Sequence, residues 1–130
     1  MKYLFILVCV IFNFISCYSQ NAFFNLGKQY AEDGNYEEAI RLTKLCIDLD
    51  SNNSDKLDLF CDYEALCDYY SRIQVPDSCI YYADKVLNIF KDVEGLEHLA
   101  VFELLSNHLL NAGCYNRAID CRIQAFNFVQ

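Results

Sequence analysis

The stretch that decides the fold is FFNLGKQYAEDGNYEEAI, residues 23–40. Large apolar residues recur at steps of three and four along its first half, at Phe23, Leu26 and Tyr30, and the same rhythm resumes after Gly34-Asn35. This spacing puts the apolar residues on one face of a helix, and glycine followed by asparagine is a turn signal. The stretch therefore predicts two helices, each of about 14 residues, that fold back on one another at Gly34-Asn35.

The pattern occurs twice more along the chain. GCYNRAI, residues 113–119, repeats the spacing of GNYEEAI at an offset of 79 residues. Between these copies a helical stripe runs over residues 57–73 and breaks at Val75-Pro76, because proline forbids an ordinary helical continuation. Asp77 or Ser78 is then expected to cap the following helix. Three helix pairs with no strand-like alternation predict an all-α domain.

The first copy resembles the tetratricopeptide repeat family. The residues that carry the resemblance are a large residue, a Leu-Gly pair, a tyrosine, the turn sequence and the close DLDSNN, namely Phe23, Leu26, Gly27, Tyr30, 34–40 and 48–53. Ser51 departs from the proline usual in the family. The resemblance implies a right-handed superhelical solenoid of about three antiparallel helix pairs, which acts as a protein-binding module.

We expect the first repeat over residues 20–53, the second over 54–93 with an extended first helix, and the third over 94–130 without a capping helix. Only small residues fit where the two helices of a pair cross, and the sequence places there Gly27 and Ala39, Cys67 and Cys79, Ser106 and Ala118. Aromatic residues are expected to fill the gaps between pairs, at Tyr30, Tyr36, Tyr70, Phe102 and Tyr115. The last helix should leave an apolar face uncovered, with Ile119, Ile123, Ala125, Phe126, Phe128 and Val129.

The N-terminal 19 residues differ from the rest. A single Lys2 precedes an apolar run, and Cys17-Tyr18-Ser19 gives the small-x-small pattern of a signal peptidase site. Residues 1–19 are therefore predicted to be a secretion signal that is cleaved after Ser19. A membrane anchor through residues 3–18 and lipidation of Cys17 are the alternatives. Cleavage would remove one basic residue and no acidic one, which changes the formal charge from -8 to -9.

The charge balance narrows the function. With 18 acidic and 10 basic residues, the chain lacks the clustered cations that bind nucleic acid. Glu94 and His98 share a helix face, but two ligands do not make a metal site, and Asp55, Asp58 and Asp62 are expected to be solvated. The sequence contains no recognisable catalytic arrangement and no phosphate-binding loop. We therefore expect no enzymatic activity, no metal, no cofactor and no small-molecule substrate.

The resemblance also implies where a partner binds. In the family the first helices of successive repeats line a groove that takes a peptide or a helix. The matching positions, which form the predicted groove, are Phe24, Lys28, Glu32, Glu64, Asp68, Arg72, Glu103, Asn107 and Asn111. Because carboxylates stand among them, the cage of Lys, Asn and Arg with which chaperone-binding members hold a terminal carboxylate is not expected.

The sequence thus predicts an exported, periplasmic or extracellular scaffold that binds a peptide or helix of a partner protein, and that can self-associate through its uncapped C-terminal helix. The alternative is an N-terminal sensory or regulatory fragment of a larger, membrane-linked signalling protein.

Overall fold

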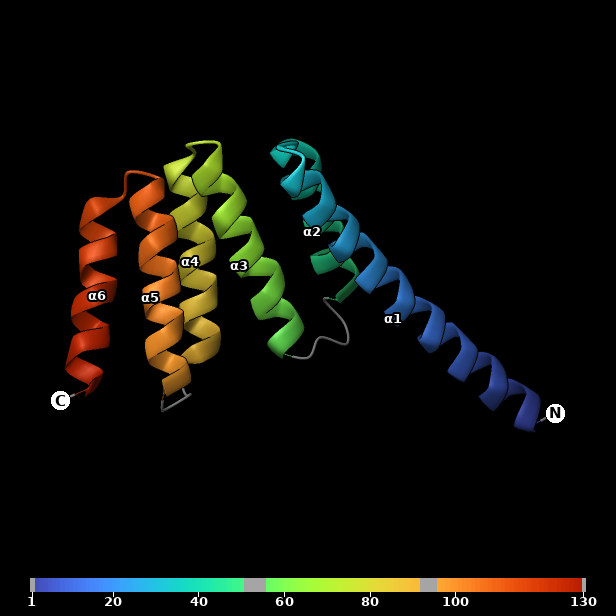
Figure 1. Ribbon diagram of the computed structural model, residues 1–130. Coiled ribbons are helices and arrows are strands. Elements are labelled where there is room, and N and C mark those ends of the chain that lie inside the picture. Colours follow the sequence, from blue (N-terminus) through green and yellow to red (C-terminus); the bar gives the residue numbers. More distant parts are fainter. Residues whose placement is uncertain (1, 51–55, 92–95, 130) are drawn as a thin grey trace. The chain divides into compact units, whose positions relative to one another are not determined.

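The computed structural model describes residues 2–50, 56–91 and 96–129, and over these residues it contains six α-helices and no strand (Figure 1). The helices are α1 (Lys2–Glu32), α2 (Tyr36–Asp50), α3 (Lys56–Arg72), α4 (Pro76–Phe90), α5 (Leu96–Asn111) and α6 (Tyr115–Val129). The predicted all-α class is confirmed. The breaks within the three pairs fall at the predicted turns, between residues 32 and 36, 72 and 76, and 111 and 115.

The chain divides into two compact units, residues 1–54 and residues 55–130. The first unit contains one helix pair, α1 and α2. The second contains two pairs, α3 with α4 and α5 with α6, and it is α5 that packs against both helices of the preceding pair. Antiparallel pairs of this kind are those of a tetratricopeptide-like solenoid, so the fold class is as predicted. The handedness of the array of three pairs stays a prediction.

In the first unit the crossing of α1 and α2 leaves no room at Gly27. A methyl group on Gly27 would lie 3.3 Å from Thr43 Oγ1 and 3.4 Å from the carbonyl oxygen of Ala39. The start of α2 is capped by Asn35, whose Oδ1 accepts a hydrogen bond of 3.3 Å from the backbone N–H of Glu38. The predicted close crossing at Gly27 and Ala39 is therefore confirmed.

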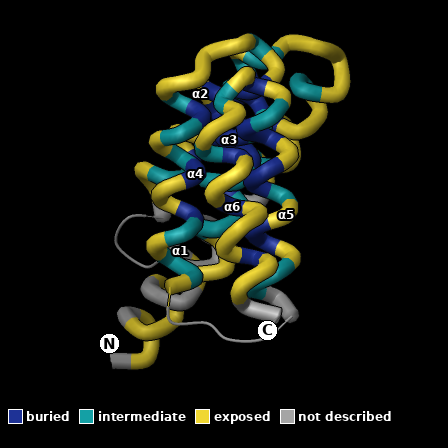
Figure 2. Tube along the Cα trace, turned by 90° about the vertical axis from the view of Figure 1, so that its left-hand side faces the viewer, coloured by how far each residue is buried: buried dark blue, intermediate teal, exposed yellow. Residues whose placement is uncertain are grey.

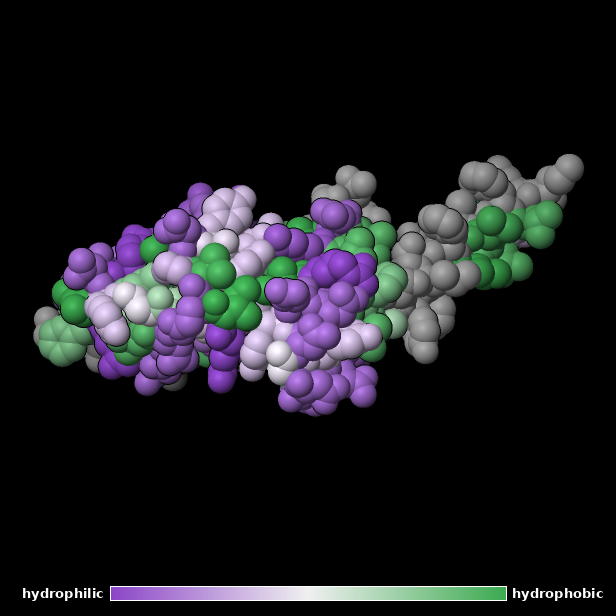
Figure 3. All heavy atoms as spheres, turned by 90° about the horizontal axis from the view of Figure 1, so that it is seen from above, coloured by the Kyte–Doolittle hydropathy of each residue, from purple (hydrophilic) through white to green (hydrophobic). Residues whose placement is uncertain are grey.

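Helix α1 is longer than expected. It continues from Lys2 through Ser19, where the sequence predicts cleavage, into the first helix of the repeat. Several of its N-terminal apolar side chains are exposed and form the green atoms at that end in Figure 3, namely Leu4, Ile6, Leu7, Val8 and Ile11. Among the residues that the structure describes, no helix is both long and apolar enough to cross a membrane. Secretion, anchoring and lipidation of this segment stay predictions.

The second unit has a continuous core. Its buried residues recur along α3, α4, α5 and α6, as the dark blue segments in Figure 2 show. Leu105, Leu109 and Val86 are almost fully enclosed. The predicted small residues of the crossings are buried as well: Cys67, Cys79, Ser106 and Ala118. The helices are thus held together by a core to which both pairs contribute.

The three turns share one backbone conformation but not one residue type. Gly34 and Gly113 both have a φ of +81°, a region that suits glycine, whereas the second turn places Gln74 at +59°. The Gln74 side chain donates hydrogen bonds from Nε2 to the carbonyl oxygens of Ser71, at 3.0 Å, and Asn111, at 2.7 Å. These bonds offset part of the cost of a left-handed conformation in a residue with a Cβ.

The start of α4 corrects one prediction. Neither Asp77 nor Ser78 caps this helix, because Pro76 already occupies its first turn and Val75 is the N-cap, with no side-chain hydrogen bond. Proline is favoured at the first helical position, since its fixed φ suits the helix and its missing N–H needs no partner there. The helix therefore begins earlier than the predicted caps allow.

Four predictions of burial are wrong. Tyr115 is 64% exposed on α6, the last helix that the structure describes. Ala125 is buried and belongs to the core, not to the uncovered face of α6. Asp62 is buried on the inner side of α3, near Leu66 in helical register, whereas Asp58 is exposed. Leu26 is 42% exposed, although it was expected on the packing stripe.

The predicted uncovered face is confirmed at Ile119, Ile123 and Phe126, while the side chains of Phe128 and Val129 lie outside the described residues.

Candidate functional site

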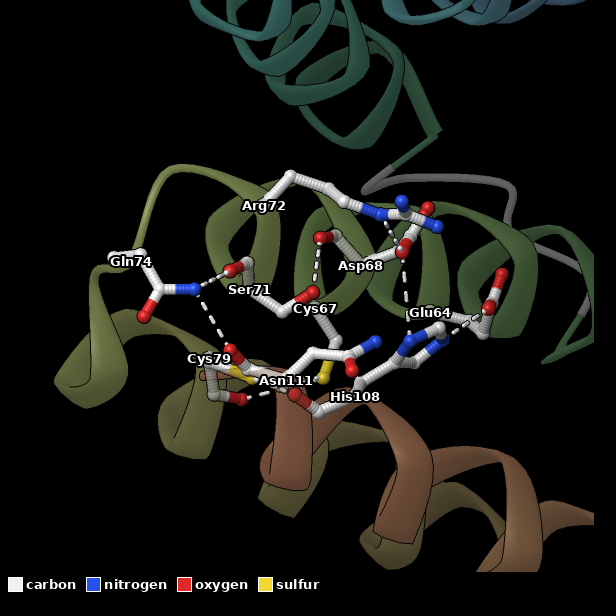
Figure 4. A network of polar contacts seen from close by, with 9 residues as sticks. All are labelled: Glu64, Cys67, Asp68, Ser71, Arg72, Gln74, Cys79, His108 and Asn111. Atoms are coloured by element: carbon white, nitrogen blue, oxygen red, sulfur yellow. Dashed lines mark hydrogen bonds and ion pairs between the residues drawn. The ribbon is translucent and has the colours of Figure 1, made fainter. Parts of the chain in front are cut away.

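A row of charged residues runs along one face of α3 and meets a histidine from α5. Glu64, Asp68 and Arg72 are spaced four apart, so their side chains project from the same side of the helix. His108 Nε2 lies 2.7 Å from Glu64 Oε1, and His108 Nδ1 lies 3.5 Å from Asp68 Oδ1. Figure 4 shows the imidazole between the two carboxylates. His108 therefore links the second and third repeats through a polar bridge.

Burial and charge act on His108 in opposite directions. Burial of the ring lowers its pKa, but the hydrogen bond with Glu64 and the negative charges of Glu64 and Asp68 raise the pKa by more. The net pKa therefore lies above the ordinary value for histidine. The His108 side chain is only 9% exposed, so the bridge is shielded from solvent. A protonated ring donates a hydrogen bond to Glu64 and carries a positive charge next to Asp68, whereas a neutral ring has only one N–H to donate.

The same face continues on both sides of the bridge. Arg72 Nε donates to Asp68 Oδ1 at 3.3 Å. On α5, Asn107 Oδ1 accepts a hydrogen bond of 3.1 Å from Arg122 of α6, and Arg122 Nε donates to Ser106 Oγ at 2.7 Å. The polar side chains of this face thus contact one another from three helices, α3, α5 and α6.

The structure brings the groove positions of the second unit onto two adjacent helices. We define the polar face by the predicted groove residues of α3 and α5: Glu64, Asp68, Arg72, Glu103, Asn107 and Asn111. Glu64 and Asp68 are half-buried because His108 covers them, and the other four are exposed. Contacts join Glu64, Asp68 and Arg72 into one group around His108. In the turn after α3, the side chain of Gln74 donates a hydrogen bond to the backbone carbonyl oxygen of Asn111.

The three groove positions of the first unit lie on α1. Lys28 and Glu32 are exposed and Phe24 is half-buried. The Lys28 ammonium lies 5.9 Å from the centre of the Phe24 ring, within the range of a cation–π contact. These residues form a group of their own within their unit.

Sequence reasoning missed His108, Gln74 and Arg122. His108 is 44 residues from Glu64, so no local spacing connects them, and Gln74 was treated only as part of a helix break. His98, by contrast, stacks on Phe102 with ring centroids 4.7 Å apart, while Glu94 lies outside the described residues. When the acidic partner of a histidine is far away in the sequence, no sequence pattern indicates their contact. The contact forms only when the helices pack.

The polar face contains carboxylate, guanidinium and amide groups. Across the described part of the chain, no group of three or more His, Cys, Asp or Glu side chains is placed to hold a metal ion. The two carboxylates at His108 lie on opposite ring nitrogens, so they hold the ring and do not converge on one point. What the face offers a ligand is a row of carboxylates, one guanidinium and two exposed amides.

Comparison with known families agrees with the first repeat. Residues 20–53 match the family described as tetratricopeptide repeat, the same residues in which the sequence carries the pattern. No curated protein matches the chain. Tetratricopeptide repeats are in general non-catalytic modules for protein–protein interaction, and the chain carries such a repeat within an all-α fold of helix pairs.

Proposed function

We propose that this protein is an exported, non-enzymatic scaffold that binds a basic segment of a partner protein on its polar face. The repeat at residues 20–53 supports the general role, since repeats of this family bind proteins. The specific observation behind the partner's chemistry is Glu103, the exposed carboxylate of the polar face, because Glu64 and Asp68 are already held by His108 and Arg72. The formal charge of the whole chain, -8, has the same sign.

The arrangement of these charges favours a Lys- or Arg-bearing segment. Arg72 is already paired with Asp68, so it neutralises one carboxylate of the face. Glu103 lies exposed on α5, one turn before Asn107 in helical register. The exposed amides of Asn107 and Asn111 can donate to and accept from a backbone that lies along α5. A segment with positive side chains and accessible peptide groups is therefore complementary to this face.

The test is binding of designed peptides, measured by fluorescence anisotropy with the full chain. Three peptides of equal length carry Lys, Ser or Glu at the same positions. We expect the Lys peptide to bind tightest and its affinity to fall as salt is added, because exposed charges are screened. Glu103→Lys should weaken binding of the Lys peptide by roughly three- to tenfold.

Asp120→Lys is the matched control, because it makes the same change of charge at an exposed position on α6. It should leave the affinity within about twofold. Equal binding of the Lys and Glu peptides, or equal loss in both variants, would contradict the proposal.

Export is a separate part of the proposal and has its own test. Expression of the full gene in a bacterial host, followed by N-terminal sequencing of the protein recovered outside the cytoplasm, should give a chain that begins at Gln20. A chain that stays in the cytoplasm with Met1 or Lys2 at its start would contradict export and leave the peptide test unaffected.

A second candidate function is self-association through α6. Tyr115, Ile119, Ile123 and Phe126 form an apolar stripe on this helix, and each is more than half exposed. We propose a second copy of the chain as its occupant, because exposed neighbours on α6 include the amides Asn116, Gln124 and Asn127, which both donate and accept and so can face their own copies. Four large side chains supply a substantial part of the ~800 Å² per partner that a stable dimer buries.

Analytical ultracentrifugation tests this second candidate. The wild-type chain should show a monomer–dimer equilibrium, and Ile123→Glu should shift it to monomer, whereas Asn88→Glu, at an exposed position on α4, should not. A wild-type chain that is monomeric at all concentrations would contradict it.

A further inference from the structure

Two cysteines meet at the crossing of α3 and α4. Cys67 and Cys79 are both fully buried, and their Sγ atoms are 3.4 Å apart. Cys67 Sγ also lies 3.5 Å from the carbonyl oxygen of Cys79, and Cys79 Sγ lies 3.8 Å from that of His108. The pair is thus enclosed between α3, α4 and α5.

The position in the repeat explains why the sulfurs are so close. Cys67 and Cys79 occupy the places that Gly27 and Ala39 take in the first pair, where the two helix backbones approach most closely. A disulfide requires a short Cβ–Cβ separation of about 3.5–4.5 Å, which ordinary helix packing rarely provides. From 3.4 Å the sulfurs need to approach by only about 1.4 Å to reach a bonded distance.

In the packed unit the pKa values of the two thiols are shifted in opposite directions. A hydrogen bond from the Cys67 thiol lowers the pKa of Cys79, and the same bond raises the pKa of Cys67. A thiolate is the nucleophile in disulfide exchange. Both sulfurs are inaccessible once the unit has packed, so the exchange takes place on the newly formed hairpin before α5 covers it.

We propose that Cys67 and Cys79 form a structural disulfide that cross-links α3 to α4 in the exported protein. The oxidant is a disulfide, carried by a protein or a small molecule. The thiolate of one cysteine attacks this disulfide, which forms a mixed disulfide and releases one carrier thiol. The thiolate of the other cysteine then attacks the Sγ of the first, which forms the intramolecular bond and releases the second carrier thiol. Two protons and two electrons pass from the cysteines to the carrier, which is reduced to two thiols. The proposal rests on the export part of the proposed function, but not on peptide binding.

Peptide mapping by mass spectrometry tests the cross-link. The full chain is unfolded, refolded with glutathione disulfide and glutathione, alkylated and digested with trypsin without reduction. Cleavage after Lys56, Arg72 and Lys85 places Cys67 on the peptide of residues 57–72 and Cys79 on that of residues 73–85. We expect these two peptides to be recovered joined, with a mass about 2 Da below the sum of their thiol forms.

Cys61 shares a tryptic peptide with Cys67, so Cys61→Ser is the matched control. The joined peptides should persist in Cys61→Ser and disappear in Cys67→Ser. Serine is tolerated at this position of the repeat, since Ser106 occupies it in the third pair and is fully buried. Joined peptides that persist in Cys67→Ser, or full alkylation of both cysteines in the refolded wild-type chain, would overturn the proposal.

A second measurement asks whether the bond is structural. Reduction of the refolded protein should lower its thermal unfolding midpoint by roughly 10 °C, the shift typical of a disulfide that closes a short loop in a small domain. Cys67→Ser should unfold at the same temperature with and without reductant. An unchanged midpoint on reduction of the cross-linked wild-type protein would also overturn the proposal.

Discussion

The first and second helix pairs fill their crossings with different side chains. In the pair α1 and α2, Gly27 and Ala39 let the backbones meet, and a Cβ on Gly27 would already crowd its neighbours. In the pair α3 and α4 the equivalent residues are Cys67 and Cys79, whose sulfurs touch at 3.4 Å. The third pair uses Ser106 and Ala118, both buried. What the fold requires at this place is a small volume, and a polarizable sulfur pair meets that requirement as well as glycine with alanine.

The turns also meet one structural requirement with different residues. Gly34 enters the left-handed region without a Cβ, whereas Gln74 enters it with one and is held there by two hydrogen bonds from its side chain. The second turn therefore departs from the family pattern in sequence. The two hydrogen bonds of the Gln74 side chain stabilise the left-handed conformation that glycine adopts without a Cβ. The following changes test how far the pairs differ, in order of decreasing effect.

Gly27→Leu should give the largest loss of stability. A leucine at this crossing has to displace Thr43 and the backbone of Ala39, so we expect a cost of roughly 3 kcal/mol or more. Urea unfolding followed by circular dichroism measures it. Lys28→Leu, the exposed neighbour, is the control and should change stability by less than about 0.5 kcal/mol. Equal effects of the two changes would show that the crossing is not tight.

His108→Ala should cost about 2 kcal/mol, because it removes the bridge and leaves Glu64 and Asp68 facing each other without a cation between them. In the first pair, Lys28 stands where α3 has Asp68. The same urea experiment gives the value, and Asp120→Ala on α6 serves as the exposed control. If both variants unfold like the wild type, the bridge does not stabilise the second unit.

The bridge also predicts a dependence on pH. Because the pKa of His108 is raised in the folded protein, the protonated ring stabilises the fold fully below the unfolded value, about 6.5, and this stabilisation is lost as pH rises through the higher folded pKa. The free energy of unfolding should therefore fall from pH 6 towards pH 8. The slope should be smaller in His108→Gln. A flat profile in the wild-type protein argues against a charged bridge.

Gln74→Gly should have the smallest effect. Glycine relieves the left-handed conformation, worth about 1 kcal/mol, but the substitution removes two hydrogen bonds of similar total value. We expect a net change within about 1 kcal/mol. Gly113→Gln, at the equivalent turn of the third pair, should cost about 1 kcal/mol because nothing replaces the glycine there. A large loss in Gln74→Gly would mean that the hydrogen bonds dominate.

The fold could be predicted from the sequence because its signals are local. Helical spacing, the turns at Gly34 and Gly113 and the small residues at the crossings each depend on residues close in the chain, and the structure confirms them. Burial was predicted less well: Leu26 is 42% exposed, whereas the equivalent Leu105 is fully enclosed by a core drawn from α3 to α6. How much of a residue is covered depends on the side chains that pack around it from other helices, which no local pattern records.

The candidate site was predicted only in part for the same reason. The repeat pattern gave the positions Glu64, Asp68 and Arg72 on one face of α3, but the partner that joins them, His108, comes from another repeat. Which side chains are free for a ligand and which hold one another is decided by contacts between helices. The sequence predicted which residues lie on the polar face, but not the contacts between their side chains.

The central claim, that the polar face binds a basic segment of a protein, is tested most directly by NMR. Addition of the Lys peptide to the isotope-labelled full chain should shift the backbone signals of Glu64, Asp68, Glu103, Asn107 and Asn111, on α3 and α5. Shifts confined to the α6 stripe at Tyr115, Ile119, Ile123 and Phe126, or no shifts at all at saturating peptide, would contradict it.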